Sequence, residues 1–534
     1  WFGKNGTWFA SGNPATGANA AFTSIPSKLY TPMFSFDRGK WIVNFGAGGS
    51  FKYTPPTDFK SLCAQNLDDT FSGDEVNDPS KYFDVKTYTG SGAARSIVTD
   101  FSPDLVWIKQ RSGTQWHYLI DSARGNRRAV FANANNANYT TNAQVLTSLN
   151  SNGFSLGTDS AVNDDGETYV NWNWDAGAGN DYSTGASVTW ASGTEDTEQP
   201  LSQVFNGYQT GDSGNIFGAS SGSFDFTYTP PSPIAFSNKV RVWTGYGSGN
   251  VYLENGGSWE AAISSNNNDW VTLKTGASGT ITKLRFTTSG NGGWWAGVEV
   301  DDTVLTNGST PSTSGSVNPK SQFVNTAAGF SISLYTATGS NLTVGHGLNA
   351  QPAVVITKDV SAAKDWLVMH EVIGVGSFLK LNESQAKAGP YTNVFTSVSS
   401  STFGTGDDAG INTNGNVRIA YCFAPIAGYS AFGSYEASGS SGLFVHLGFK
   451  PAFLMIKGAD HTSSWNIRDN KRDSLNPNEA HLVANGDTTE ATQEDIDFVS
   501  NGFVVRSTDA GYNSSDTFVY CAWAEHPFKT ARAS

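Results

Sequence analysis

One pattern of residues occurs three times along this chain of 534 residues. Each copy has a tyrosine before a glycine-bearing turn, and then an apolar run that opens with proline and ends with lysine. The runs are residues 103–109, 352–358 and 451–457. A phenylalanine follows each run at nearly constant distance, at Phe154, Phe403 and Phe503. Because fixed spacing indicates a copied structural unit, the pattern predicts three modules of one fold.

Two features of the copies indicate β-strands that bury one face. A tryptophan lies seven or eight residues after each lysine, at Trp116, Trp366 and Trp465, and its recurrence predicts a place in the core of each copy. The last strand of each copy alternates apolar residues: Val170, Trp172 and Trp174, then Ile419, Tyr421 and Phe423, then Val519, Cys521 and Trp523. A period of two places each set on one buried face.

The local signals and the composition agree with strands. Proline lacks a backbone N–H, but the first residue of a strand does not need that donor for the hydrogen bonds of the sheet. Asn-Gly pairs at 152–153 and 501–502 suit tight hairpins. Aromatic residues make up 13% of the chain and charged residues only 15%, with 58 glycines. The predicted fold class is all-β, with serial β-sandwich modules: three copies of one repeat and one inserted β-sandwich.

The spacing of the copies sets the predicted domains, since one core cannot organise so long a chain. Copies two and three follow directly, whereas a stretch of about one domain separates copies one and two. The predicted domains are 1–67, 68–180 for copy one, 187–310 for the inserted sandwich, 320–427 for copy two and 428–534 for copy three. The chain opens at Trp1 inside an expected hairpin, so we expect further residues upstream.

Charge and sequence motifs narrow the function. A net charge of −14 with 33 Lys and Arg argues against binding nucleic acid. Apolar runs of membrane-spanning length are absent, so we expect no membrane insertion. Three scattered cysteines, Cys63, Cys422 and Cys521, imply no disulfide framework.

The chain also lacks the usual sequence motifs of enzymes and cofactor sites. Metal-binding His-Glu-x-x-His, phosphate-binding and dinucleotide-binding motifs do not occur. We therefore expect no enzyme activity, no catalytic residues, no cofactor and no metal. Acidic pairs such as Asp301-Asp302 are interpreted as solvated turns, with calcium binding as the alternative. A glycosidase with paired carboxylates stays open, because sequence does not give their separation in space.

Candidate binding residues gather in the inserted sandwich. They are Trp294, Trp295, Trp259 and Tyr246, which we predict to contact a glycan or another receptor. Adjacent residues of a strand point to opposite faces, so at most one of Trp294 and Trp295 can join the core. The alternative is that both pack at an interface or beneath a loop.

Two resemblances suggest where such a chain belongs. The Asn5-Gly6 hairpin, Val-Asn-Phe-Gly at 43–46 and Pro-Pro-x-x-Phe-Lys-Ser-Leu-Cys at 55–63 resemble the C-terminal half of a SPRY domain. The threefold unit, with its Tyr-Thr-Gly-x-Gly turn, Pro-to-Lys strand and Asn-Gly-Phe hairpin, resembles repeated modules beside SPRY domains in tail-fibre-like proteins of marine bacteriophages and cyanophages.

The second resemblance implies a virion fibre or spike on the tail or capsid surface. Its implied partners are copies of itself, as a homotrimer, other virion proteins, and a polysaccharide or protein receptor on the host. Two alternatives remain: a capsid decoration protein or head fibre without essential receptor binding, and a tailspike enzyme that degrades polysaccharide.

Overall fold

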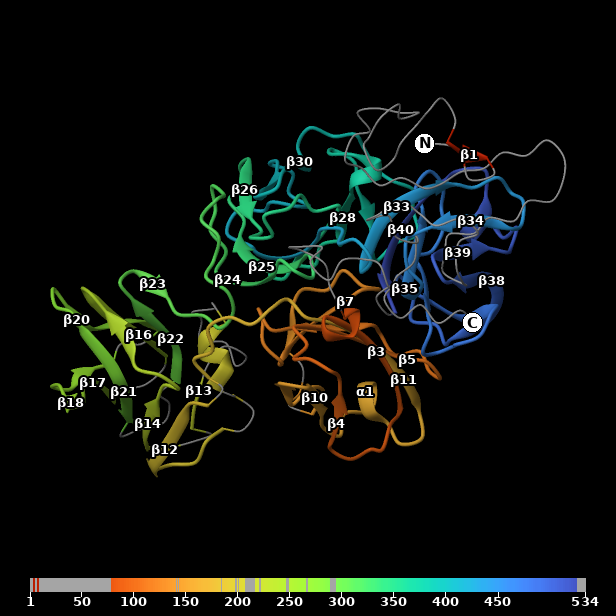
Figure 1. The fold of residues 1–534 in the computed structure, drawn as a ribbon. Helices are drawn as coiled ribbons and strands as arrows, with labels where there is room; N and C mark the ends of the chain where they lie inside the picture. The colour runs from red at the N-terminus through yellow and green to blue at the C-terminus, as the bar shows by residue number, and fades with distance from the viewer. Residues whose placement is uncertain are drawn as a thin grey trace. The chain divides into compact units, whose positions relative to one another are not determined.

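A computed structural model describes residues 3–4, 7–8 and 78–525, except 141, 143, 184, 197–198, 200, 207–216, 220–221, 246–248, 266–267 and 289–293. Strands dominate, and the two α-helices are single turns, α1 (Ser160–Asn163) and α2 (Ala510–Asn513) (Figure 1). The all-β prediction is therefore confirmed. Within the described ranges, none of the helices is long and apolar enough to cross a bilayer.

The chain divides into two compact units, residues 1–73 with 528–533 and residues 74–527 with Ser534. In the first unit the structure describes the hairpin of β1 (Gly3–Lys4) and β2 (Thr7–Trp8), with Lys4 paired to Thr7. The sequence predicted this hairpin. The rest of the predicted SPRY-like module lies outside the described residues.

Copy one is a sandwich of a six-stranded and a three-stranded antiparallel sheet. The larger sheet has the order β3-β11-β5-β6-β7-β8 and the smaller one β4-β10-β9. The bounds are β3 (Phe83–Thr89), β4 (Arg95–Val98), β5 (Leu105–Gln110), β6 (Tyr118–Asp121), β7 (Arg128–Phe131), β8 (Tyr139–Thr140), β9 (Ser148–Asn150), β10 (Gly153–Leu156) and β11 (Thr168–Trp174).

Copy two repeats the order of the first five strands of the larger sheet and of the smaller sheet, and it adds β24 (Ser321–Asn325) at the sheet edge. In place of β8 it has a single bridge between Phe378 and Ala388. Its other strands are β25 (Phe330–Thr336), β26 (Leu342–Gly345), β27 (Val354–Asp359), β28 (Leu367–His370), β29 (Leu379–Lys380), β30 (Phe395–Val398), β31 (Thr402–Thr405) and β32 (Val417–Phe423).

Copy three joins its strands into one sheet, in the order β33-β40-β35-β36-β37-β38-β39-β34. They are β33 (Ser430–Glu436), β34 (Leu443–His446), β35 (Pro451–Gly458), β36 (Asn466–Asp469), β37 (Asn478–Val483), β38 (Ala491–Val499), β39 (Gly502–Val505) and β40 (Thr517–Ala524). The three copies share one strand order, as their spacing predicted.

The central strands of each copy are buried on both faces, as in β5, β27 and β35, where every residue is buried. In copies one and two, one face packs on the smaller sheet of the same copy, around Phe154 or Phe403. In copy three it packs on the far strands of the same sheet, around Phe503. The other face belongs to a core that all three copies share. The sandwiches are thus serial along the chain and also packed against one another.

The shared core is built from matching positions of the three copies. They are Leu105, Val354 and Phe453 on the Pro-to-Lys strands, and Trp174, Phe423 and Trp523 on the last strands. The aromatic rings of Trp174 and Phe453 lie 6.0 Å apart, and those of Trp174 and Trp523 lie 5.4 Å apart. Burying one such side chain contributes about 1.5–3 kcal/mol, so the shared core favours association of the copies.

Three matching backbone hydrogen bonds join the copies in a closed ring. The donors and acceptors are Asn138 and Val360 (2.9 Å), Lys387 and Ala459 (2.8 Å), and Glu490 and Arg111 (2.8 Å). Each donor lies at one equivalent position of its copy, and each acceptor lies two residues after the lysine of the repeat. Copy one therefore contacts copy two, copy two contacts copy three, and copy three contacts copy one.

The tryptophan prediction holds for two copies and is wrong for the first. Trp366 and Trp465 are buried, and their backbone N–H groups donate to Asn382 and Asn485. In copy one the equivalent residue is His117, which donates to Asn133 in the same way. Trp116 precedes that position and is 39% exposed. It lies seven residues after its lysine instead of eight, and this shift of one residue turns its side chain out of the core.

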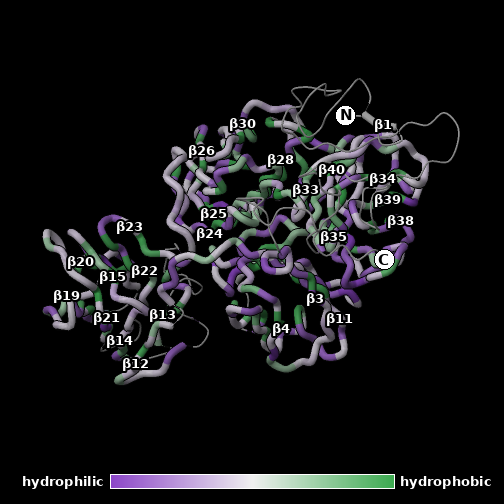
Figure 2. The backbone as a smooth tube through the Cα atoms, viewed as in Figure 1, coloured by the Kyte–Doolittle hydropathy of each residue, from purple (hydrophilic) through white to green (hydrophobic). Residues whose placement is uncertain are grey.

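The inserted region is a separate sandwich of a seven-stranded and a five-stranded sheet. The larger sheet contains β12 (Ser187–Ser192), β14 (Phe224–Thr229), β15 (Ile234–Phe236), β17 (Gly249–Asn255), β18 (Ser258–Trp259), β19 (Ile263–Ser264) and β21 (Gly279–Thr288). The smaller contains β13 (Phe217–Gly218), β16 (Lys239–Thr244), β20 (Asp269–Thr275), β22 (Trp294–Val300) and β23 (Thr303–Val304). Hydrophobic and hydrophilic residues alternate along its strands (Figure 2).

Candidate functional site

The outer face of the seven-stranded sheet in the inserted sandwich combines aromatic rings with charged groups. Strands β14, β21 and β17 lie side by side, with Tyr252 paired to Arg285 and Glu254 paired to Lys283. The alternate residues Phe226, Leu284 and Phe286 are buried in the core, so their neighbours point outward. We call this surface the charged aromatic face: Asp225, Tyr252, Glu254, Trp259, Lys283 and Arg285.

Trp259 is the most exposed ring of this face, at 46%. It lies on β18, which is joined to β17 by a turn with glycines 256 and 257 at positive φ. The ammonium of Lys283 lies 5.9 Å from its ring centroid and 2.9 Å from the Oε1 atom of Glu254. Burial raises the pKa of Glu254, but hydrogen bonds from Lys283 and Thr282 outweigh it and lower that pKa. The cation is thus fixed beside the indole.

Arg285 holds the second half of the face. Its guanidinium donates to both carboxylate oxygens of Asp225, with N–O distances of 2.9 and 2.6 Å. The same guanidinium lies 5.2 Å from the ring centroid of Tyr252. A bidentate pair of this kind fixes the side chain, so its unused donors keep a defined direction.

Such a surface has the chemistry to bind a sugar. Aromatic rings offer flat apolar faces to the C–H groups of a pyranose, and fixed carboxylate, ammonium and guanidinium groups exchange hydrogen bonds with its hydroxyls. The sequence identified Trp259 but missed Lys283 and Arg285. The alternation in residues 281–286 could have found both, because it turns these two side chains away from the apolar face.

The structure separates the four residues that were predicted to bind. Trp259 is exposed, whereas Trp295 is 1% exposed and packs in the sandwich core, 4.8 Å from the ring of Phe286. Its indole N–H donates to the carbonyl of Gly297. Trp295 is therefore a core residue of the sandwich. The side chain of Trp294 and the whole of Tyr246 lie outside the described residues.

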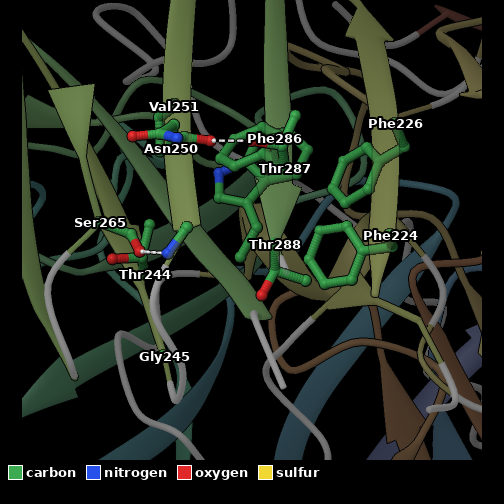
Figure 3. Close-up of a pocket in the computed structure, with 12 residues that line it drawn as sticks. Phe224, Phe226, Thr244, Gly245, Asn250, Val251, Ser265, Phe286, Thr287 and Thr288 are labelled. Carbon is green, nitrogen blue, oxygen red and sulfur yellow. Dashed lines mark hydrogen bonds between the residues drawn. The ribbon is translucent and has the colours of Figure 1, made fainter. Parts of the chain in front are cut away.

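A small hollow of about 20 Å³ lies between the two sheets of the inserted sandwich. Figure 3 shows the rings of Phe224 and Phe226 along one side, with Thr287 and Thr288 beside them. Phe286 and Trp295 complete the apolar lining. All four aromatic side chains are buried and belong to the sandwich core. The hollow is a gap in core packing, and we assign the binding role to the outer face.

A Ser-His-Asp group in copy three was not found from the sequence. His461 Nδ1 lies 3.3 Å from Asp516, and Ser514 Oγ lies 3.3 and 3.2 Å from the two ring nitrogens. The Nε2 atom is 3.0 Å from the carbonyl of Ala510, to which it donates. An oxygen almost equally distant from both ring nitrogens does not lie along the lone pair of either one, so the serine is not aligned to give its proton to the imidazole.

The acidic residues do not gather into a metal site within the described part of the chain. Among the residues that the structure describes, no cluster of three or more His, Cys, Asp or Glu could hold an ion. Asp301 accepts hydrogen bonds from the backbone of Ser237, Lys239 and Asn238, which hold its pKa well below the usual range. Its carboxylate thus closes a turn.

Comparison with known proteins gives one family. A family model described as "Domain of unknown function (DUF7483)" matches residues 78–198 and 301–527, and leaves out residues 199–300 within the inserted sandwich. No curated protein matches the chain. A solved cupin 2 conserved barrel domain protein from Leptotrichia buccalis aligns over 46% of this chain and 92% of that chain, at 6% identity and a TM-score of 0.13. A likeness this low supports no inference.

Proposed function

This chain belongs to the DUF7483 family, and we propose that it is a structural protein of a bacteriophage virion, a fibre or spike that attaches to a glycan on the host surface. The sequence resemblance to tail-fibre-like proteins supports the virion location. The observation that carries the glycan contact is Trp259, an exposed indole beside the ammonium of Lys283, which an ion pair with Glu254 fixes in place.

The architecture supports different roles for the three copies and for the inserted sandwich. The three copies form a closed ring with a shared core, which suits a rigid support. The inserted sandwich has a core of its own and interrupts the family match between copies one and two. A recognition module added to a stable body can vary without disturbing that body. We therefore assign structural support to the copies and recognition to the insertion.

We also propose that the fibre assembles as a homotrimer with other virion proteins as its neighbours. The contacts between copies are made within a single chain, so these faces are already occupied. The contacts between chains must then use other surfaces.

Binding of the purified chain to host surface polysaccharide tests the proposal. Replacing Trp259→Ala is expected to weaken binding about tenfold or more, since a stacking surface is lost, with no change in the unfolding midpoint. Leu475→Ala is a matched control, because Leu475 is a highly exposed apolar residue of copy three. Equal binding by the Trp259→Ala variant, or no binding by the natural chain, would contradict the proposal.

Two further readouts separate the alternatives. Sustained release of oligosaccharides from the glycan would favour the polysaccharide-degrading enzyme. Normal adsorption of a phage that lacks the protein would favour a capsid decoration protein. The proposal predicts neither result.

A further inference from the structure

Copy one carries a surface cluster of four aromatic side chains: Trp116, Tyr118, Phe131 and Tyr139. The ring of Phe131 lies at its centre, with centroid distances of 4.8 Å to Trp116, 4.9 Å to Tyr118 and 5.8 Å to Tyr139. Phe131 is buried and Tyr118 is partly buried. Trp116 and Tyr139 are 39% and 52% exposed. Two rings thus lie open to solvent on an anchored aromatic base.

The other two copies have no aromatic residue at any of these four positions. The three copies can be aligned on Asn133, Asn382 and Asn485, which accept equivalent hydrogen bonds. In this alignment Phe131 corresponds to Lys380 and Val483, and Tyr139 corresponds to Ala388 and Ala491. Counting from the residues that donate those bonds, Trp116 corresponds to Asp365 and Ser464, and Tyr118 to Leu367 and Asn466. The copies form the same central strands with either set, so the fold of these strands does not require the aromatic cluster.

Polar groups flank the cluster. Burial raises the pKa of Tyr118 to about 12, and Asp159 and Tyr139 add to this rise. Asn142 lies three residues after Tyr139 along the chain. Asn142 donates from its side chain to Asp159, whose other carboxylate oxygen accepts from the backbone of Ala161 at 2.9 Å. This carboxylate and amide, which begin three residues after Tyr139 in the chain, offer partners for hydroxyl groups.

The size of the patch also indicates its ligand. A stable protein interface buries about 1,200–2,000 Å² in total, with many apolar side chains at its centre. Here two exposed rings stand beside a carboxylate and an amide, which suits a few sugar units better than a protein surface. The nearby carboxylate and the net charge of −14 disfavour an anionic sugar.

We propose that the aromatic cluster of copy one is a second carbohydrate-binding platform, which takes a neutral glycan by stacking sugar rings on Trp116 and Tyr139. This inference rests on the proposed function, because it assigns a second contact to the same host polysaccharide. Two platforms on one chain would raise the avidity for a repeating polymer.

Calorimetric titration with neutral polysaccharide tests the platform in the full chain. The double replacement Trp116→Ala with Tyr139→Ala is expected to weaken binding about tenfold, and Trp116→Phe to keep most of it. Added to Trp259→Ala, the double replacement should remove the residual binding. Tyr391→Ala, which removes an exposed ring of copy two, is the control and should bind like the natural chain.

The outcomes distinguish this inference from the proposed function. If the double variant binds the glycan as tightly as the natural chain while Trp259→Ala loses affinity, the platform is overturned and the proposed function is kept. A natural chain that binds no glycan would overturn both. Thermal unfolding of each variant shows whether the fold is kept. If the double variant unfolds at a lower temperature, the Trp116→Phe variant replaces it in the test. Glycan binding at Trp116 should then quench more tryptophan fluorescence in the natural chain than in the Trp116→Phe variant. Equal quenching in the two proteins would overturn the platform.

Discussion

The indole nitrogen of Trp366 donates a hydrogen bond to the backbone carbonyl of Phe131, 2.8 Å away across the junction between copies two and one. Trp465 makes the same bond to Lys380 at the next junction. At the third junction His117 takes the place of the tryptophan and accepts a hydrogen bond from Trp107 instead. The indole bond thus recurs at two of the three junctions, whereas the imidazole of the third bonds to a tryptophan of its own copy.

We expect Trp366→Ala to destabilise the protein by about 3–5 kcal/mol, because it leaves a large cavity and an unpaired carbonyl. Urea unfolding followed by circular dichroism measures the loss. Trp116→Ala serves as the control, since the exposed ring is expected to contribute less than about 1 kcal/mol. Equal losses for the two variants would contradict the assignment of Trp366 to the core.

The hydroxyl of Tyr421 donates to Asp121 at 2.7 Å across the junction of copies two and one, where Asp121 is also paired with Arg124. Tyr421→Phe keeps the ring and removes the donor, so we expect a loss of about 1–3 kcal/mol in unfolding free energy. Tyr139→Phe is the control, because that tyrosine is exposed. An unchanged unfolding free energy in the Tyr421→Phe variant would show that the carboxylate of Asp121 needs no partner from copy two.

Asn412 closes a turn of copy two with its side chain. Its amide donates to the carbonyls of Ser340 and Gly406, both at 2.6 Å, and its oxygen accepts from the backbone of Thr338 and Gly339. Replacement by alanine leaves several buried backbone groups without partners, so we expect a loss of about 2–4 kcal/mol in thermal or urea unfolding. A loss below about 0.5 kcal/mol would mean that water replaces the side chain.

Stability should fall as the pH drops from about 6.5 to 4. Burial lowers the pKa of His370 to about 4 and that of His481 to about 3. The ordinary value of about 6.5 applies in the unfolded chain. The unfolded state therefore binds a proton that the folded state does not bind, and each histidine lowers the stability by on the order of 3 kcal/mol by pH 4.

Urea unfolding at several pH values checks this slope. His370→Asn should flatten it between pH 6.5 and 4, even if the variant is less stable throughout. The exposed His446→Asn is the control and should keep the slope. An unchanged slope in the His370→Asn variant would contradict the effect of burial.

The sequence predicted the strands, the three copies and the insertion, because spacing and alternation depend on local backbone geometry. It did not predict the shared core, since a period of two indicates a buried face without indicating what covers it. The burial of the lysine that ends each apolar run was also not predicted. Lys358 is fully buried, its ammonium donates to the carbonyl of Asp359, and burial lowers its pKa to about 7.

The candidate site was predicted in part for a related reason. Trp259 and Trp295 have similar sequence surroundings, and only the sheet register places one outside and the other in the core. In copy one, Trp116 was assigned to the core because a tryptophan recurs at nearly the same distance from the lysine in all three copies. A shift of one residue reverses the facing of a strand, so the sequence alone could not distinguish Trp116 from His117.

The account depends on the three copies forming one body, and hydrogen exchange after Phe453→Ala tests this most directly. Phe453 of copy three lies 5.7 Å from Trp172 and 6.0 Å from Trp174 of copy one, measured between ring centroids. We predict faster amide exchange in the last strand of every copy, β11, β32 and β40, by a similar factor. Faster exchange confined to β40 and its neighbours in copy three would contradict a shared core.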